Sequence, residues 1–524
     1  AYWLSFGQGK VLVTTLNPRG WYRPWVAEDG RDPEVAKRSQ WVATEPLAYL
    51  ARTLVEEHVV PRPSAAAESR FVTEEIGYKI VGPVTVTAVL GMYCVTLLGV
   101  GLWLLSRGSL PQLGWFGPAA AVAAAMILVL LGRQTRQAVP PTVAMLQIVD
   151  LAPGDQELTA DGQMAIYLPS SYNGPLGAQQ GGLFGDSESL GAAGKNPRMT
   201  WQDFAAWRYE NHGLPAGVSV MPFRYSGQLD TPVRADARFG PSGLQGTIQT
   251  GPFDGLSDGV IVTSSSARTA VRLGDANSFS AAPADVLASG QFAGAAMVDD
   301  RRRRRAALLG DVLNPPERMG YFPQQPMLYL WADPLDMHFI TPEDAQRTGA
   351  ALVSIPLSLQ PTPPGEQVLI AASFLPYRTV AAPGKQSAAP TYDNVRKAWI
   401  GPVTKETETY LRFQVPQSVL PLELSDATLT VSINAPGREL TIYGLEDGAP
   451  VEVANRSSPV GTIAIALNNP AALQVDEQGG LVLGVVVGPF AGEASDSISA
   501  TGWTIEDVRL QLRGEVVSRK TVSK

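Results

Sequence analysis

The side chains that most often carry catalysis or bind metals are few and scattered in this sequence. The three histidines, His58, His212 and His338, lie far apart, and none has a neighbour at metal-ligand spacing. The densest polar group is Asp333 and Asp336 in the segment WADPLDMHF, close to His338. These aspartates can contact a cation or a sugar, but a turn capped by an aspartate side chain fits the segment better. The sequence therefore predicts no catalytic residue, no cofactor site and no metal site.

Two short motifs resemble enzyme signatures without the elements that those signatures need. Residues 255–259 read GLSDG and match the G-x-S-x-G pattern, in which a serine nucleophile stands between a strand and a helix. Here Val260–Thr263 follows, and it is typical of a strand, so we predict a hairpin turn. Gly7–Lys10 resembles a phosphate-binding loop, but it precedes a strand and leaves no helix N-terminus for a phosphate.

The most unusual charge pattern is the run Arg301–Arg305, which follows Asp299 and Asp300. Acidic residues suit the start of a helix, and a helix would spread the five arginines around its circumference. One interpretation is a solvated helix with local ion pairs. The functional alternative is a partner contact by Arg301, Arg302, Arg303, Arg304 and Arg305 with an acidic protein patch or anionic lipid headgroups. Nucleic acid is disfavoured, because no aromatic residues interleave the run and no second basic patch exists.

These residues must be positioned by a chain that is organised around the apolar run from Ile80 to Leu131. Two uncharged stretches, each close to the ~20 residues that span a bilayer as a helix, are separated by Arg107. We predict a transmembrane helical hairpin over residues 80–132, with its turn at Ser106–Leu113. Two crossings place both flanking parts on the same side of the membrane.

The rest of the chain is predicted to be mainly β, because its 51 glycines and 42 prolines favour many short strands. Residues 140–380 form a β-rich region with an Ig-like section at about 218–290 and a helix at about 284–313. Strands on either side of that section are expected to pair in one sheet. A short helix is expected after Thr200. A linker over Thr379–Asp393 leads to a C-terminal β-sandwich of jelly-roll type at 396–515.

The first 65 residues look like the end of an α/β domain. Lys10–Leu16 is typical of a strand, and apolar residues from Leu47 to Val55 recur at helical spacing. The text FGQGKVLVTTLNP, then EPLAYLARTLVEE and a membrane run, resembles bacterial membrane-anchored proteins of uncharacterised function with a glutamine-amidotransferase-like α/β domain. The loop RGSLPQLGWFGP and the segment AVPPTVAMLQIVDLAPGD resemble the same group. No catalytic residue is carried over, since this part holds no nucleophilic cysteine.

We infer the side of the membrane on which the large domains lie from the family resemblance, and give less weight to the charges that flank the hairpin. Lys79, Arg133 and Arg136 flank one side of the hairpin and Arg107 the other, which by a simple count would put the domains in the cytoplasm. The resemblance implies the opposite, and the β-rich character fits an exported protein. We therefore expect the large domains on the periplasmic or extracytoplasmic side of the cytoplasmic (inner) membrane. The single cysteine, Cys94, lies within the first apolar stretch and is interpreted as a packing residue.

The sequence as a whole predicts a non-catalytic structural or interaction protein, a scaffold or accessory subunit of a larger membrane complex. Its expected partners are the lipid bilayer and other protein chains, without nucleic acid, and a glycan is a further option. No cofactor is expected. Two alternatives stay open: a cell-surface carbohydrate- or cell-wall-binding protein, and the membrane-anchoring part of an enzyme whose catalytic segment lies upstream.

Overall fold

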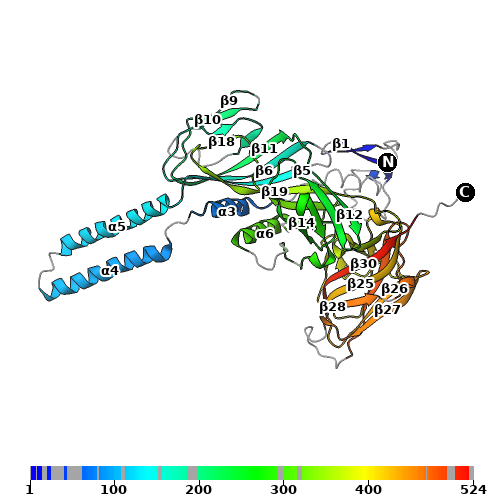
Figure 1. Cartoon of the computed structure of the whole chain (residues 1–524). Helices are drawn as coiled ribbons and strands as arrows, with labels where there is room; N and C mark the ends of the chain where they lie inside the picture. Colours follow the sequence, from blue (N-terminus) through cyan, green and yellow to red (C-terminus); the bar gives the residue numbers. More distant parts are fainter. Residues whose placement is uncertain are drawn as a thin grey trace. The chain divides into compact units, whose positions relative to one another are not determined.

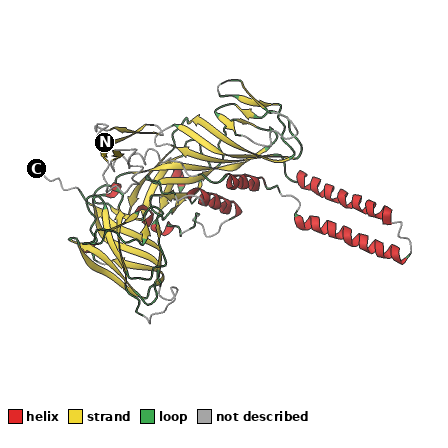
Figure 2. Cartoon of the chain, turned by 180° about the vertical axis from the view of Figure 1, so that it is seen from behind, coloured by secondary structure: helices red, strands yellow, loops and turns green. Residues whose placement is uncertain are grey.

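The computed structural model describes most of the chain and divides it into two compact units, residues 1–61 and 62–524. The described residues are 2–6, 9–13, 21–24, 41–43, 62–78, 82–107, 113–151, 156–185, 197–203, 205–288, 290–292, 299–314, 321–467, 469–491 and 502–518. Outside the helical hairpin, strands dominate both views of the molecule (Figures 1 and 2). The chain is therefore mainly β, as its turn-rich composition predicts.

The first unit contains two antiparallel strand pairs. β1 (Tyr2–Phe6) pairs with β2 (Gly9–Val13), and β3 (Tyr22–Pro24) pairs with β4 (Trp41–Ala43). The strand predicted over Lys10–Leu16 corresponds to β2 in its described part. The helix expected between Leu47 and Val55 lies outside the described residues.

Two long apolar helices follow one another in the second unit and lie side by side (Figure 1). α4 (Pro83–Ser106) and α5 (Leu113–Gln137) contain apolar spans of 24 and 21 residues, and in the 18-residue apolar window of each span only 6% and 0% of the residues are buried. Val84, Leu98 and Trp115 are 80%, 66% and 85% exposed. Core helices of soluble proteins bury such side chains, so these two helices have the length and the surface of membrane spans.

The largest element is a sheet whose neighbouring strands run in the order β12-β13-β16-β15-β14-β17-β19-β5-β6-β11-β8. Its strands are β5 (Thr142–Leu151), β6 (Glu157–Leu168), β8 (Gly182–Phe184), β11 (Gly217–Gln228), β12 (Arg234–Gly240), β13 (Gly243–Gln249), β14 (Ser257–Val262), β15 (Thr269–Leu273), β16 (Ser278–Ala281), β17 (Met327–Ala332) and β19 (Gln346–Leu359).

The long strand β19 holds this sheet together. It pairs in parallel with β5 through residues 346–354, antiparallel with β17, and in parallel with β12 through residues 357–359. Strands before and after the expected Ig-like section thus share one sheet. β12 pairs with both β13 and β19, so the strands β12, β13, β16, β15, β14, β17 and β19 form a closed barrel within the larger sheet.

Two helices cover one face of this sheet. α3 (Ala65–Ile76) begins at the N-cap Ser64 and ends at Gly77 in the left-handed conformation. It stacks Phe71 on Trp331 of β17 at 5.7 Å between ring centroids. α6 (Asp300–Leu313) buries Leu308, Leu309, Val312 and Leu313 beside it. α6 is shorter than the helical region expected from residue 284, since Pro283–Asp285 is a separate 3₁₀ turn.

A small sheet beside the large one replaces the helix that was expected after Thr200. Its order is β18 (Phe339–Ile340), β7 (Gly177–Ala178), β10 (Trp207–Glu210) and β9 (Arg198–Trp201). That helix prediction is wrong because Trp207 is buried in tertiary contacts: it packs edge-on against Phe184, and its indole N–H donates to the Gly182 carbonyl. These contacts override the helical spacing of the aromatic residues.

The C-terminal part is a two-sheet sandwich. One sheet contains β20 (Gln367–Ile370), β30 (Thr504–Val516), β25 (Leu422–Asn434) and β28 (Val460–Leu467). The other contains β21 (Tyr377–Val380), β24 (Thr407–Gln414), β29 (Gly480–Val487), β26 (Glu439–Glu446) and β27 (Ala449–Ser457). A separate short pair is β22 (Tyr392–Asp393) with β23 (Ala398–Trp399).

The sandwich begins before the boundary at 396 that the sequence suggested. β20 pairs with β30 and β21 with β24, so the turn-rich segment at 379–393 lies within this domain. The short 3₁₀ turn Ala372–Phe374 joins it to the large sheet: Phe374 packs edge-on against Phe239, and the Thr263 hydroxyl donates to the Ser373 carbonyl. The two β regions therefore share a continuous apolar core.

Gly349 lies where β19 pairs with β5, at a φ of +137°, and a Cβ there would come within 1.9 Å of the Met145 carbonyl oxygen. We predict that Gly349→Ala lowers the free energy of unfolding by more than about 3 kcal/mol, because the strands must separate. Gly365→Ala is the matched control, since Gly365 has a φ of +87° with nothing within 4 Å. It should cost about 1 kcal/mol. Denaturant unfolding of the detergent-solubilised chain, followed by tryptophan fluorescence, measures both; equal costs would contradict the prediction.

Candidate functional site

The histidines and aspartates that the sequence singles out do not gather into a site in the described structure. His58 lies outside the described residues. His212 is buried near Tyr209, and the backbone N–H of His338 donates to the Asp336 carboxylate at 3.0 Å. The latter contact is the aspartate-capped turn that the sequence predicts. Over the ranges that are described, no group of three or more histidine, cysteine, aspartate or glutamate side chains could hold a metal ion.

The GLSDG segment forms a turn that leads into a strand. β14 starts at Ser257 and pairs with β17, so no helix follows the serine. Asp258 adopts a positive φ of 48°, and the Ser257 hydroxyl accepts a hydrogen bond from Arg305 at 2.9 Å. This serine is therefore part of a structural contact with α6 and lacks the geometry of a nucleophile elbow.

The arginine run on α6 is used largely for internal contacts. Arg302 and Arg305 both pair with Asp258, at 3.2 and 3.3 Å. Arg305 is 5% exposed, and its guanidinium lies over the ring of Trp331 at 5.2 Å. Burial lowers the pKa of Arg305, and the neighbouring charge of Arg301 lowers it further, while Asp258 raises it.

Of the remaining arginines of the run, one contacts another helix and two are exposed to solvent. Arg304 pairs with Glu75 of α3 at 2.9 Å, which ties the two covering helices to each other. Arg303 and its partner Asp300 on the same helix are 72% and 84% exposed. Arg301 is exposed and has no ion pair with any residue that the structure describes. Of the five residues predicted to contact a partner, Arg301 and Arg303 are exposed and form no ion pair with another element in the described part of the chain.

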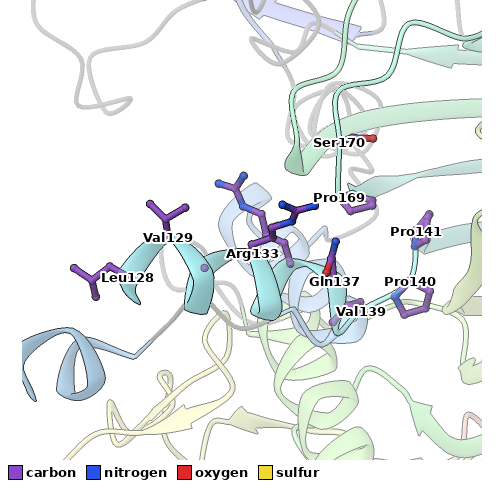
Figure 3. Close-up of a pocket in the computed structure, with 11 residues that line it drawn as sticks. Leu128, Val129, Arg133, Gln137, Val139, Pro140, Pro141, Pro169 and Ser170 are labelled. Atoms are coloured by element: carbon purple, nitrogen blue, oxygen red, sulfur yellow. The ribbon is translucent and has the colours of Figure 1, made fainter. Parts of the chain in front are cut away.

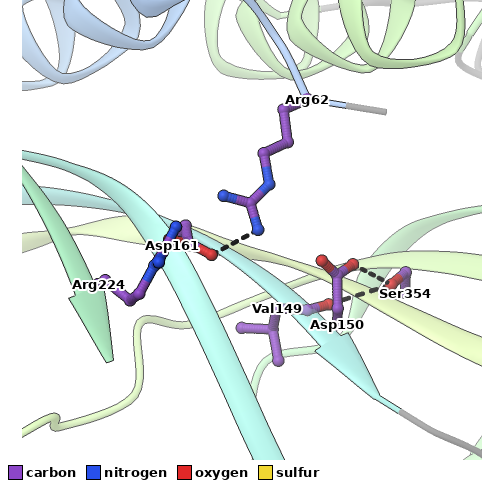
Figure 4. Close-up of polar contacts among 6 residues, drawn as sticks. All are labelled: Arg62, Val149, Asp150, Asp161, Arg224 and Ser354. Carbon is purple, nitrogen blue, oxygen red and sulfur yellow. Dashed lines mark hydrogen bonds and ion pairs between the residues drawn. The ribbon is translucent and has the colours of Figure 1, made fainter. Parts of the chain in front are cut away.

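A partly buried polar cluster under the first turn of α3 was not identified from the sequence (Figure 4). Asp161 of β6 receives two guanidinium groups: Arg62 donates to one carboxylate oxygen at 2.5 Å and Arg224 of β11 to the other at 2.8 Å. Asp161 and Arg224 face each other in the register of β6 and β11. On the adjoining strands, the Ser354 hydroxyl donates to Asp150 at 2.8 Å.

Burial changes the acidity of the carboxyl groups in this cluster. Glu68 of α3 is 9% exposed, and desolvation raises its pKa from 4.5 to about 7, against the lowering effects of a hydrogen bond to Gln163 and the charge of Arg62. Desolvation also raises the pKa of Asp150, while its bond to Ser354 opposes the rise. Glu68 therefore binds its proton at a higher pH than an ordinary glutamate does, with a pKa of about 7.

The position of these carboxyl groups favours a role in packing over catalysis. Glu68 lies between α3 and the sheet, next to the buried side chains Phe71 and Val72 of the same helix. A general acid or base must reach a substrate, and this carboxyl instead lies in a helix–sheet contact. The cluster thus sets how firmly α3, the element that precedes α4, is held on the sheet.

Comparison with known proteins assigns no family. No family model matches the sequence, and no curated protein matches it. A structure of infectious bursal disease virus, Gx strain, aligns with 12% identity over 71% of this chain and 72% of that chain, with a TM-score of 0.12. A membrane-anchored protein from Corynebacterium diphtheriae aligns with 7% identity over 72% and 84%, with a TM-score of 0.10. Scores this low support no conclusion about fold or function.

The buried arginine gives a stability prediction. Arg305→Ala should lower the free energy of unfolding by about 3 kcal/mol, because Asp258 loses a buried ion-pair partner and the Trp331 ring loses the guanidinium that packs over it. Arg303→Ala, on the exposed side of the same helix, should change it by less than about 0.5 kcal/mol. Denaturation curves of both variants test this, and coincident midpoints would contradict it.

The raised pKa of Glu68 gives a pH prediction. The folded chain holds a proton that the unfolded chain has lost between about pH 4.5 and 7, so stability falls as pH rises through that window. Glu68→Gln removes this loss and should stabilise the protein at pH 8 by up to about 3 kcal/mol, with no gain near pH 4.5. Glu74→Gln, exposed on the same helix, is the control. Thermal unfolding across pH 4.5–8 decides: parallel curves for the two variants would exclude this role of Glu68.

Proposed function

We propose that this chain is a non-catalytic, membrane-anchored structural or interaction protein that holds β domains at a membrane surface as a scaffold or accessory subunit. The observation that carries the proposal is the attachment of the hairpin. Tyr167 of β6, fully buried, stacks on Tyr78 just before α4 at 4.7 Å and donates its hydroxyl to the carbonyl of Arg136 in α5 at 2.6 Å. One core residue thus fastens both ends of the apolar hairpin to the large sheet.

The character of the described polar groups supports the same proposal. The arginines of α6 and the carboxyl groups under α3 join secondary-structure elements to each other. Such contacts stabilise a fixed shape, and a fixed shape attached to a bilayer suits a protein that positions other chains. Arg301 and Arg303 remain the residues that we propose for a protein partner.

The finer assignments remain part of this proposal. We infer from the resemblance of the first 65 residues that the chain is related to bacterial membrane-anchored proteins with a glutamine-amidotransferase-like domain. The same resemblance, with the β-rich domains, supports a place in the cytoplasmic membrane with the large domains outside. Protease treatment of intact spheroplasts should then digest residues 140–515; resistance until the membrane is broken would reverse this orientation.

A second candidate, carbohydrate binding, is favoured by a groove between the C-terminal sandwich and the preceding β region. The groove has a volume of about 790 Å³ and presents Trp399, hydroxyls of Thr430 and Ser432, and the acid Asp507. An aromatic ring, hydroxyl groups and a carboxylate lining one groove suit a sugar. A fragment that starts at residue 396 would lack β20 and β21, which belong to the sandwich. A glycan array should therefore be probed with the full chain in nanodiscs.

The scaffold proposal predicts a stable complex in the native membrane. Chemical cross-linking in cells that make the protein, followed by purification in mild detergent, should yield a stoichiometric second chain linked to the β domains. Arg301→Glu with Arg303→Glu should weaken that link, since it reverses the exposed charge, while Arg238→Glu on β12 is the exposed control. A chain that purifies alone after cross-linking, or that binds a defined glycan on the array, would overturn the proposal.

A further inference from the structure

A groove lies where α5 meets the large sheet (Figure 3). It has a volume of about 980 Å³, and its lining includes Arg133 and Arg136 of α5 together with Pro169 and Ser170 after β6. In the figure, Pro169 and Ser170 stand across from Arg133, and Leu128 and Val129 lie further along α5, away from the sheet. One wall is therefore the end of an apolar helix and the other is the rim of the β domain.

The two arginines lie at the end of the apolar span of α5, which is where a bilayer around that span would place its headgroups. The apolar span of α5 is Gly114–Gln134, whose 21 residues extend about 32 Å as a helix, close to the thickness of a hydrocarbon core. Arg133 stands at the end of this span and Arg136 less than one turn beyond it, so both occupy the same face. Both are exposed, and neither forms an ion pair with a residue in the described part of the chain.

The groove continues into an apolar surface on the membrane side. Val129, which is 68% exposed, and Leu128 lie about one turn before Arg133. A ligand that follows this surface needs an anionic end for the guanidinium groups and an apolar end for these side chains. Arginine is suited to phosphate because its planar group can donate two parallel hydrogen bonds.

The two walls are fixed to each other by protein contacts. The Tyr167 hydroxyl bonds the Arg136 carbonyl at 2.6 Å, and Tyr167 stands two residues before Pro169. Pro140 and Pro141, which also line the groove, restrict the backbone between α5 and β5. The separation of the arginines from the opposite wall is thus set by the fold.

We propose that this groove binds an anionic phospholipid, with its phosphate between Arg133 and Arg136 and an acyl chain along Leu128 and Val129. The inference rests on the proposed membrane anchoring and adds a specific ligand to it. An acidic protein segment would satisfy the arginines but would leave the apolar wall, which lies within the span, uncovered.

Native mass spectrometry of the full chain released from nanodiscs tests the lipid site. With equal amounts of phosphatidylglycerol and phosphatidylcholine, the chain should retain phosphatidylglycerol preferentially, and Arg133→Gln with Arg136→Gln should weaken that retention about tenfold or more. Arg107→Gln, at the opposite end of the hairpin beside Trp103, is the matched control and should keep it. Equal retention of both lipids, or an unchanged double variant, would overturn the proposal.

Two further measurements separate the remaining outcomes. A photoreactive phosphatidylglycerol should label residues 128–137 of the unmodified chain, which does not depend on any variant folding. Glycerol 3-phosphate should not displace the lipid at millimolar concentration; displacement would assign the groove to a soluble phosphate ester. A chain that does not insert into nanodiscs would refute the membrane anchor itself, whereas insertion without lipid preference would refute the lipid site alone.

Discussion

The structure depends on one constraint, the joining of an apolar hairpin to a water-facing sheet at Tyr167. This residue is buried on β6, where its ring stacks on Tyr78 and its hydroxyl satisfies a carbonyl at the end of α5. The final carbonyls of a helix have no partner within the helix, so a bond from the domain both satisfies one and fixes the helix direction. The hairpin and the sheet are coupled through this contact.

The face of the sheet beneath α3 changes from apolar to polar along its strands. This change determines which residues of α3 pack on the sheet and which make polar contacts with it. Ala165 and Tyr167 lie on the same face of β6 as Gln163 and Asp161, which continue it toward the first turn of α3. The apolar end anchors the helix near the membrane, and the polar end meets Arg62 and Glu68. Protonation of Glu68 near neutral pH therefore affects the packing of α3, the helix that precedes α4 in the chain.

The sequence predicted local structural features well, but it predicted the roles of individual charged residues less well. The exposed apolar spans, the strand-rich composition and the turn at Asp336 follow from residues that are close together in the chain. The arginine run was recognised, but which of its members are buried depends on Asp258 and Trp331, which approach from other strands. The cluster around Asp161 gave no signal, because Arg62 and Arg224 are single charges separated from it by 99 and 63 residues.

The sequence alone determined that this chain has two helices fit for lipid and many short strands, because hydropathy and turn residues act over a few neighbours. Only the tertiary structure decided that β19 pairs with β5 and β12, which lie far from it in the sequence, and that the sandwich includes β20 and β21. It also decided that Tyr167 contacts both ends of the hairpin. Strand pairing and burial bring together residues that no local pattern links, so they are settled by the packing of the whole chain.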